Sequence, residues 1–188
     1  LQGRFTVVFR VYVEKQSGFD VKAQHLNHEL KEILGIDSLK STRIINRYDV
    51  EGISEDLFNT AIKTVFSEPP VDNTYDYLPI STSEHVFAME FLPGQFDQRA
   101  ESASECIQLI SQGERPRVRT AQILAFKGDL SKKDLDAIKH YIINPVEARE
   151  ASLDKVNTLQ TETVIPANVE VINGFNDLDE QGLEKFIE

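Results

Sequence analysis

The chain has 188 residues, enough for one medium-sized domain or for a small domain with an appendage. Its 31 acidic and 20 basic side chains give a net charge of −11, which argues against nucleic acid or a membrane surface as a partner, because both are bound through dense positive charge. Cys106 is the single cysteine and no apolar run approaches the roughly 18 residues of a membrane span, so we expect a soluble, cytoplasmic protein without a disulfide framework.

The first half of the chain predicts a strand, a helix, a strand and a helix. Alternating side chains rich in β-branched residues indicate the strands, and apolar residues at helical spacing indicate the helices. Asp20 and Ser54 precede the two helices as N-caps, and Gly35 is suited to end the first helix. The expected ranges, the last being a proline-containing linker or surface loop, are 6–14, 20–34, 41–50, 54–66 and 67–82.

The second half restarts this pattern, and the character of the chain then changes after Pro145. An extended connector without periodicity is expected at 151–172, followed by a last helix from Asp177. The apolar residues of that helix have no visible partner, so we interpret the chain as continuing in a larger protein. The strands and helices expected before Pro145 are 86–92, 97–111, 118–127 and 131–143.

A repeated motif relates the two halves. Gly18-Phe-Asp-Val-Lys-Ala23 and Gln95-Phe-Asp-Gln-Arg-Ala100 both place Phe-Asp ahead of a basic residue and an alanine. The helices that follow share one apolar stripe, which predicts two copies of one supersecondary unit and burial of both motif phenylalanines. The stripe residues are Phe19, Ala23, Leu26, Leu30 and Ile33 in the first copy and Phe96, Ala100, Ala103, Ile107 and Ile110 in the second.

These observations predict an α+β fold in which duplicated β-α-β-α ferredoxin-like halves form a pseudo-dimer. The halves are expected at about 5–66 and 84–143 within an N-terminal domain of residues 1–146. Residues 147–188 are then an extended linker and a terminal helix.

The residue types that carry chemistry form no catalytic constellation in this sequence. Glycine-rich phosphate loops and a nucleophile elbow are both missing from it. His25 and His28 have the spacing of a metal-binding pair, but no third ligand lies nearby, which favours two surface histidines. A catalytic thiol needs an electropositive setting, and Cys106 follows Glu105, so we expect a packed cysteine. We therefore predict no catalytic, cofactor or metal site within the chain.

Arginines supply the candidate contact residues. Arg115, Arg117 and Arg119 alternate along the start of a predicted strand and are expected to project to one side. They either form an anion site or protect a strand edge from mispairing. With Arg99 and Arg149 they make up the candidate interface or anion contacts.

Three segments resemble the N-terminal region of the large, single-chain phosphoribosylformylglycinamidine synthases. Leu92-Pro-Gly-Gln-Phe-Asp-Gln-Arg-Ala100, with the helix after it, is the most specific of them. Ile143-Asn-Pro-Val-Glu-Ala-Arg149 is similar to the end of that region, and Asn173-Gly-Phe-Asn-Asp-Leu178 is similar to the start of the family's linker domain. The resemblance covers about residues 5–188.

The resemblance implies a parent enzyme of de novo purine biosynthesis, a glutamine amidotransferase that uses ATP and magnesium. It converts formylglycinamide ribonucleotide to formylglycinamidine ribonucleotide. This chain would be its N-terminal structural domain, which bridges the synthase and glutaminase domains, resembles a dimer of a small subunit fused into one chain, and is itself non-catalytic because it lacks both active sites. The alternatives are a stand-alone ferredoxin-like module that regulates or binds a small ligand, and an independent small enzyme.

Overall fold

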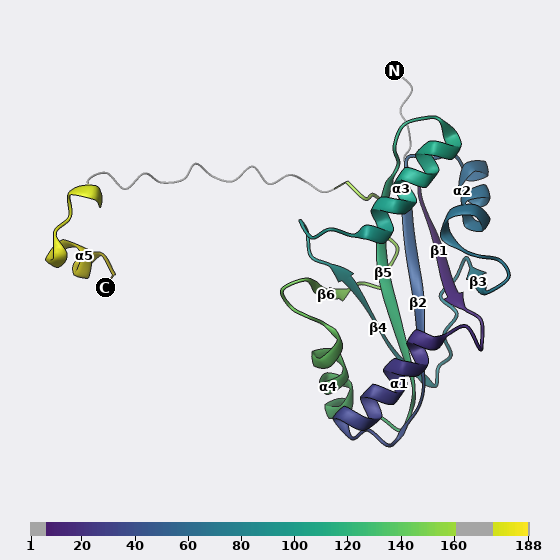
Figure 1. The fold of residues 1–188 in the computed structure, drawn as a ribbon, viewed down its shortest axis with the longest axis horizontal. Helices are drawn as coiled ribbons and strands as arrows, with labels where there is room; N and C mark the ends of the chain where they lie inside the picture. Colours follow the sequence, from purple (N-terminus) through teal and green to yellow (C-terminus); the bar gives the residue numbers. More distant parts are fainter. Residues whose placement is uncertain (1–6, 161–174, 188) are drawn as a thin grey trace.

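The computed structural model describes residues 7–160 and 175–187. Within these residues the chain forms one six-stranded antiparallel sheet and five α-helices, which confirms the predicted α+β class (Figure 1). The strands are β1 Val8–Lys15, β2 Leu39–Glu51, β3 Asp72–Tyr75, β4 Glu84–Phe91, β5 Arg117–Gly128 and β6 Ala148–Ala151, in the spatial order β3-β1-β2-β5-β4-β6. The helices are α1 Val21–Leu34, α2 Glu55–Ala61, α3 Gln98–Ser111, α4 Lys132–Ile142 and α5 Glu180–Ile187, with a π-helical turn at Ile62–Phe66 and a 3-10 turn at Phe175–Asp177.

The register of the sheet repeats along the chain with an offset of 76 residues. Adding 76 to the bounds of β1 gives the bounds of β4, and adding 76 to the bounds of β3 gives those of β6. The pairings follow the same rule, since Tyr12 lies opposite Tyr75 and Ala88 lies opposite Ala151. The strand order is therefore symmetric about the central β2–β5 pair.

The middle of the sheet lies at Asn46 and Gln122, which pair with each other and are themselves 76 residues apart. The Gln122 amide Nε2 donates to Asn46 Oδ1 over 3.4 Å. β1 pairs with β2 only as far as Ile45, so α1 begins near this middle and leads out to the far end of β2. α3 does the same for the second half and runs toward the opposite end of the sheet (Figure 1).

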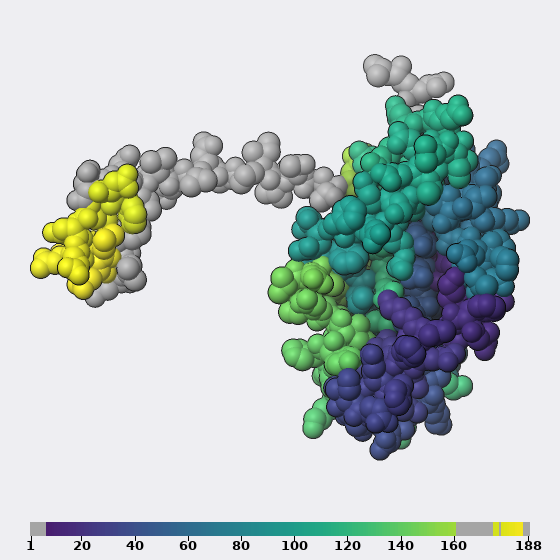
Figure 2. All heavy atoms as spheres, viewed as in Figure 1, coloured from purple at the N-terminus to yellow at the C-terminus, as the bar shows by residue number. Residues whose placement is uncertain are grey.

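The strands that flank α1 are antiparallel neighbours, as are those that flank α3. In a β-α-β unit the two strands are parallel, whereas here the two strands around each long helix run in opposite directions. α1 and α3 lie across the strands on one face of the sheet, and Figure 2 shows their surfaces approaching each other over its middle.

Two apolar clusters under the helices each draw on both halves of the chain. In the first, Ala103 and Ile107 of α3 pack with β1, β2 and α2. In the second, Leu30 of α1 packs with β4, β5 and α4. Each long helix therefore helps to bury the strands of the other half, and neither half has a complete core of its own.

The ends of the predicted helix stripes are exposed, which contradicts the expected burial. The exposed fraction is 55% for Phe19, 70% for Phe96, 62% for Ile33 and 46% for Ile110. The two phenylalanines precede the helices. The last turn of α1 still packs on the second cluster through Leu34, which leaves Ile33 to the side of the buried residues. Cys106 is also exposed on α3 rather than packed.

Helix caps follow the sequence signals with one exception. Ser54 accepts from the Leu57 amide, and Ser131 forms a capping box with Asp134. Gly35 ends α1 in the left-handed conformation at φ 67°, which glycine adopts without strain. Asp20 does precede α1, but its carboxylate accepts from no backbone amide of the first helical turn and binds the Gln24 side-chain amide instead.

Two short strands were not predicted. The segment expected as a linker or loop at 67–82 contains β3, which pairs with β1 at the edge of the sheet. β6 lies just after the expected domain boundary at residue 146 and pairs with β4 at the other edge. The described part of the expected connector, residues 152–160, continues from β6 over the sheet face opposite the helices. Its remainder to residue 172 lies outside the described residues.

Buried charges hold residues 152–160 on that face. Arg10 donates to the carbonyl oxygens of Leu153 and Asp154 over 2.9 and 3.1 Å. Glu51 is fully buried and accepts from the Leu159 amide over 2.8 Å and from the Thr158 hydroxyl over 2.9 Å. A buried carboxylate needs hydrogen-bond donors, and this segment supplies them to Glu51. Residues 152–160 are therefore held against the sheet face.

Replacing Glu51 with alanine will release this attachment. Hydrogen bonds to a charged acceptor contribute about 1.5–3 kcal/mol, so hydrogen exchange at the Leu159 amide should accelerate about tenfold or more. Glu147→Ala, which removes an exposed glutamate, is the matched control and should leave the Leu159 rate unchanged. Equal exchange rates in the Glu51 variant and the wild type would show that Leu159 is held by its apolar contacts alone.

Candidate functional site

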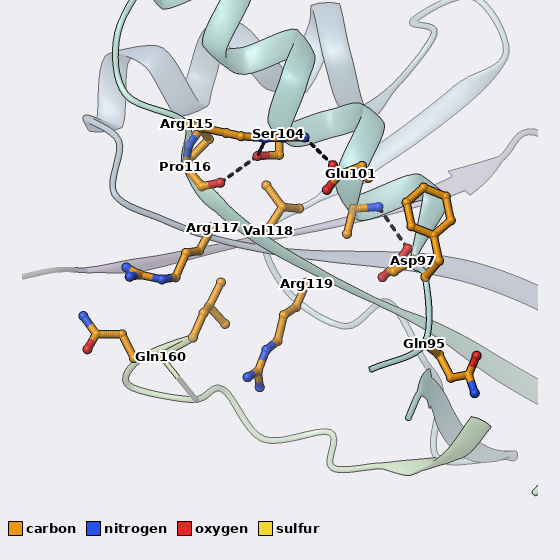
Figure 3. A pocket seen from close by; sticks show the side chains of 13 residues that line it. Gln95, Asp97, Glu101, Ser104, Arg115, Pro116, Arg117, Val118, Arg119 and Gln160 are labelled. Atoms are coloured by element: carbon orange, nitrogen blue, oxygen red, sulfur yellow. Dashed lines mark hydrogen bonds and ion pairs between the residues drawn. The ribbon is translucent and has the colours of Figure 1, made fainter. Parts of the chain in front are cut away.

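A concave surface lies where β5 loses its neighbour on one side. β4 pairs with β5 no further than Gln122, so Arg117 to Ala121 have β2 on one side and no described strand on the other. A pocket of about 740 Å³, which we call the edge pocket, lies here between the start of α3 and residues 159–160 (Figure 3).

Asp97 positions α3 over the edge pocket. Its Oδ1 accepts from the Ala100 amide over 2.9 Å and so caps the helix, as the sequence predicted. Its Oδ2 accepts from the Thr120 hydroxyl over 2.7 Å, which joins the helix start to β5. Both oxygens are engaged, so this carboxylate has a positioning role.

Arg115 lies on the helix side of the pocket, where acidic side chains of α3 neutralise it. Its Nη2 is 2.7 Å from Glu101 Oε1 and 3.4 Å from Glu105 Oε1. Its Nε donates to the Ser104 hydroxyl over 3.1 Å, and Ser104 donates in turn to the Pro116 carbonyl over 2.7 Å. This network fixes the loop between α3 and β5.

Arg117 and Arg119 extend from β5 to the other side of the pocket, away from α3 and toward Gln160 (Figure 3). They lie two residues apart in the strand and therefore share a face. The prediction that all three arginines project to one side is wrong for Arg115, because the residue lies in the loop before β5 and its side chain is drawn to Glu101.

The other two candidate arginines lie elsewhere. Arg149 is on β6, with its Nη2 2.7 Å from Glu90 Oε1, so a carboxylate already neutralises it. Arg99 is on the first turn of α3 and lines a second pocket of about 610 Å³, which we call the axial pocket because it includes Gln122. The five arginines therefore do not gather in one site.

A residue that the sequence analysis did not single out also lines the axial pocket. Lys22 occupies in the first repeat the position that Arg99 occupies in the second, since each comes two residues after the Asp of the Phe-Asp motif. The repeated motif aligns Lys22 with Arg99 in the sequence. The sequence does not indicate, however, that the two helices begin close to each other.

The charges of the face opposite the helices were also missed. Arg43 bridges Glu14 and Glu84, with nitrogen–oxygen distances of 2.7 and 3.1 Å. Its hydrogen bond to Glu14 and that to Glu84 raise the pKa of the guanidinium above its usual range against the opposing effect of burial. Burial would raise the pKa of Glu84, but the Ser81 amide and Arg43 lower it. The three charged side chains neutralise one another through these ion pairs, which indicates a structural role.

In the part of the chain that the structure describes, no group of three or more His, Cys, Asp and Glu side chains is placed to hold a metal ion. His25 and His28 are exposed on α1. None of the described helices is long and apolar enough to cross a membrane.

Comparison with known proteins does not assign the chain to a family. No protein-family model matches the chain, and no curated protein sequence matches it.

Proposed function

We propose that this chain is the N-terminal domain of a single-chain phosphoribosylformylglycinamidine synthase, where it bridges the synthase and glutaminase domains without taking part in the chemistry. The observation that carries the proposal is the register of the sheet, which repeats with an offset of 76 residues about the Asn46–Gln122 pair. A small subunit fused to a second copy of itself would produce this repeat. For the fold, this proposal means that the two halves are duplicated ferredoxin-like units that form a pseudo-dimer within one chain.

Exposed apolar side chains support a role in contacts between domains. The exposed fraction is 77% for Leu109 and 70% for Phe96, both in or beside α3, and 72% for Val146. Bridging requires such surfaces on a rigid scaffold, and the shared core of the two halves provides that rigidity. In this proposal ATP, magnesium and glutamine are bound by the other domains of the parent enzyme.

Reconstitution tests the proposal. A single-chain synthase lacking its N-terminal region is assayed for glutamine-dependent amidine formation with and without this chain supplied in trans. We expect the chain to co-elute with the truncated enzyme and to restore turnover, and we expect the chain alone to form neither amidine nor glutamate.

The comparison arm adds the Leu109→Asp variant, which places a charge on an exposed helix position and should weaken association while leaving the fold intact. Turnover by the purified chain alone would contradict the non-catalytic role. A folded chain that neither associates nor restores turnover would contradict the bridging role.

A second function, a small-ligand-binding module, is favoured by one observation. The volume of the axial pocket, about 610 Å³, lies within the roughly 300–1,000 Å³ that small-molecule sites occupy. Ligand binding by the chain alone, without any effect on a truncated synthase, would support this function over bridging.

A further inference from the structure

The repeated motif brings two basic side chains to one place. Lys22 is the second residue of α1 and Arg99 is the second residue of α3, and adding 77 to the first number gives the second. Both helices begin near the Asn46–Gln122 pair, and both side chains line the axial pocket. The pocket therefore receives one cationic side chain from each half of the chain.

Neither cation is neutralised there. Among residues 7–160 and 175–187, no side chain forms an ion pair or a hydrogen bond with the side chain of Lys22 or Arg99. Desolvation by burial lowers the pKa of Lys22, and the positive charge of Arg99 lowers it further. An anion between the two side chains would relieve their repulsion.

The acidic groups of the axial pocket are already engaged. Glu90 Oε1 accepts from Arg149 Nε over 2.9 Å. Asp97 is occupied by the Ala100 amide and the Thr120 hydroxyl. Asp97 keeps its negative charge because both of its donors are neutral, but Lys22 and Arg99 outnumber it. The axial pocket therefore carries a positive net charge, although the chain as a whole carries −11.

Hydrogen-bond donors accompany the two cations. The Gln98 and Arg99 amides open α3 and have no backbone acceptor in the described part of the chain, as the geometry of a helix start requires. Ser102, a residue with a hydroxyl donor, lines the same pocket one turn further on. Such donors suit the several oxygens of a tetrahedral oxyanion.

An apolar wall adjoins these donors. Met89, Phe91 and Phe96 line the axial pocket, and Phe91 and Phe96 are 46% and 70% exposed. A bare ion would leave this wall unused, whereas an organic group attached to the anion would cover it.

We propose that the axial pocket binds a small phosphate monoester, with the phosphate held between Lys22 and Arg99 and the organic group against Phe96. This inference goes beyond the bridging role, because the pocket is complete within this chain and needs no other domain.

Titration with two probes tests the site. Inorganic phosphate and phenyl phosphate are each added to the ¹⁵N-labelled chain at constant ionic strength, and amide shifts are followed by NMR. We expect both probes to shift the Gln98 and Arg99 amides, and phenyl phosphate to bind more tightly. Shifts spread evenly over the surface, or none at millimolar probe, would overturn the proposal.

Variants separate the two parts of the site. Lys22→Gln and Arg99→Gln should each weaken the binding of both probes about tenfold, since each removes a charge-assisted contact. Lys63→Gln, which removes an exposed lysine from the π-helical turn, should leave both affinities unchanged. An Arg99→Gln chain that binds like the wild type would overturn the assignment of the cation pair.

The aromatic wall has its own matched pair. Phe96→Ala should weaken phenyl phosphate about fivefold and leave inorganic phosphate unchanged, because only the ester reaches the ring. Phe19→Ala alters the equivalent residue of the first repeat, which does not line the axial pocket, and should change neither affinity. Equal affinities for the two probes, unaffected by Phe96→Ala, would mean that the site takes a free ion and would overturn the monoester.

Discussion

Replacing Leu30 or Ile107 with alanine is expected to lower the free energy of unfolding by about 2–5 kcal/mol in each case. Both side chains are fully buried, and adding 77 to the first number gives the second, so they occupy the same position in the two repeated helices. Leu30 packs with β4, β5 and α4, and Ile107 packs with β1, β2 and α2. Each variant therefore weakens a core that both halves build, and we expect a single cooperative transition.

Ile33→Ala and Ile110→Ala are the matched controls, one turn further along the same helices. Their side chains are 62% and 46% exposed, so each change should cost no more than about 1 kcal/mol. Urea unfolding followed by far-ultraviolet circular dichroism measures all four variants. Two separate transitions, or an Ile33 variant as unstable as the Leu30 variant, would contradict the shared core.

The helices and long strands were predictable from the sequence because local signals specify them. Ser54 and Ser131 act as N-caps and Gly35 ends α1, so those helices begin or end where these residues place them. The apolar stripe was correct only for its central positions. Periodicity tells which side of a helix is apolar, but it does not tell how far the partner surface extends, and so Phe19 and Phe96 were wrongly expected to be buried.

The edge strands and the segment beyond β6 were not predictable in the same way. β3 and β6 have four residues each, too few for a pattern to emerge, and their pairing depends on distant partners. The same holds for Leu159, which is 3% exposed in a stretch without periodicity. Its burial follows from the attachment of its amide to Glu51, a contact between residues 108 positions apart.

For the candidate site, the sequence supplied residue types but not their grouping. Alternation predicted a shared face for Arg117 and Arg119, and the structure places both on one side of the edge pocket. Alternation failed for Arg115, because the strand begins only at Arg117. Arg99 was singled out without Lys22, since the relation between them arises only when the two helix starts meet over the sheet.

Asp49 lies between Arg10 and Arg47 on the face opposite the helices. We expect its removal to lower the free energy of unfolding about as much as the loss of a buried core side chain. The Asp49 side chain is 3% exposed, its Oδ2 accepts from Arg10 Nη2 over 3.0 Å, and the same oxygen lies 3.1 Å from Arg47 Nε. Burial alone would lower the pKa of Arg10, but the hydrogen bond and charge of Asp49 raise it. Burial lowers the pKa of Arg47, which Asp49 only partly offsets.

Asp49→Ala leaves both guanidinium groups buried without their carboxylate, so we expect the free energy of unfolding to fall by about 3–5 kcal/mol. Glu90→Ala, which breaks the exposed pair with Arg149, is the control and should cost no more than about 1 kcal/mol. Urea unfolding of the two variants gives the comparison. Because Arg10 and Arg47 also donate to the backbone of residues 152–154, the Asp49 variant should lose hydrogen-exchange protection there first. Equal costs for Asp49→Ala and Glu90→Ala would mean that water reaches the cluster, and the segment at 152–160 would then not seal this face of the sheet.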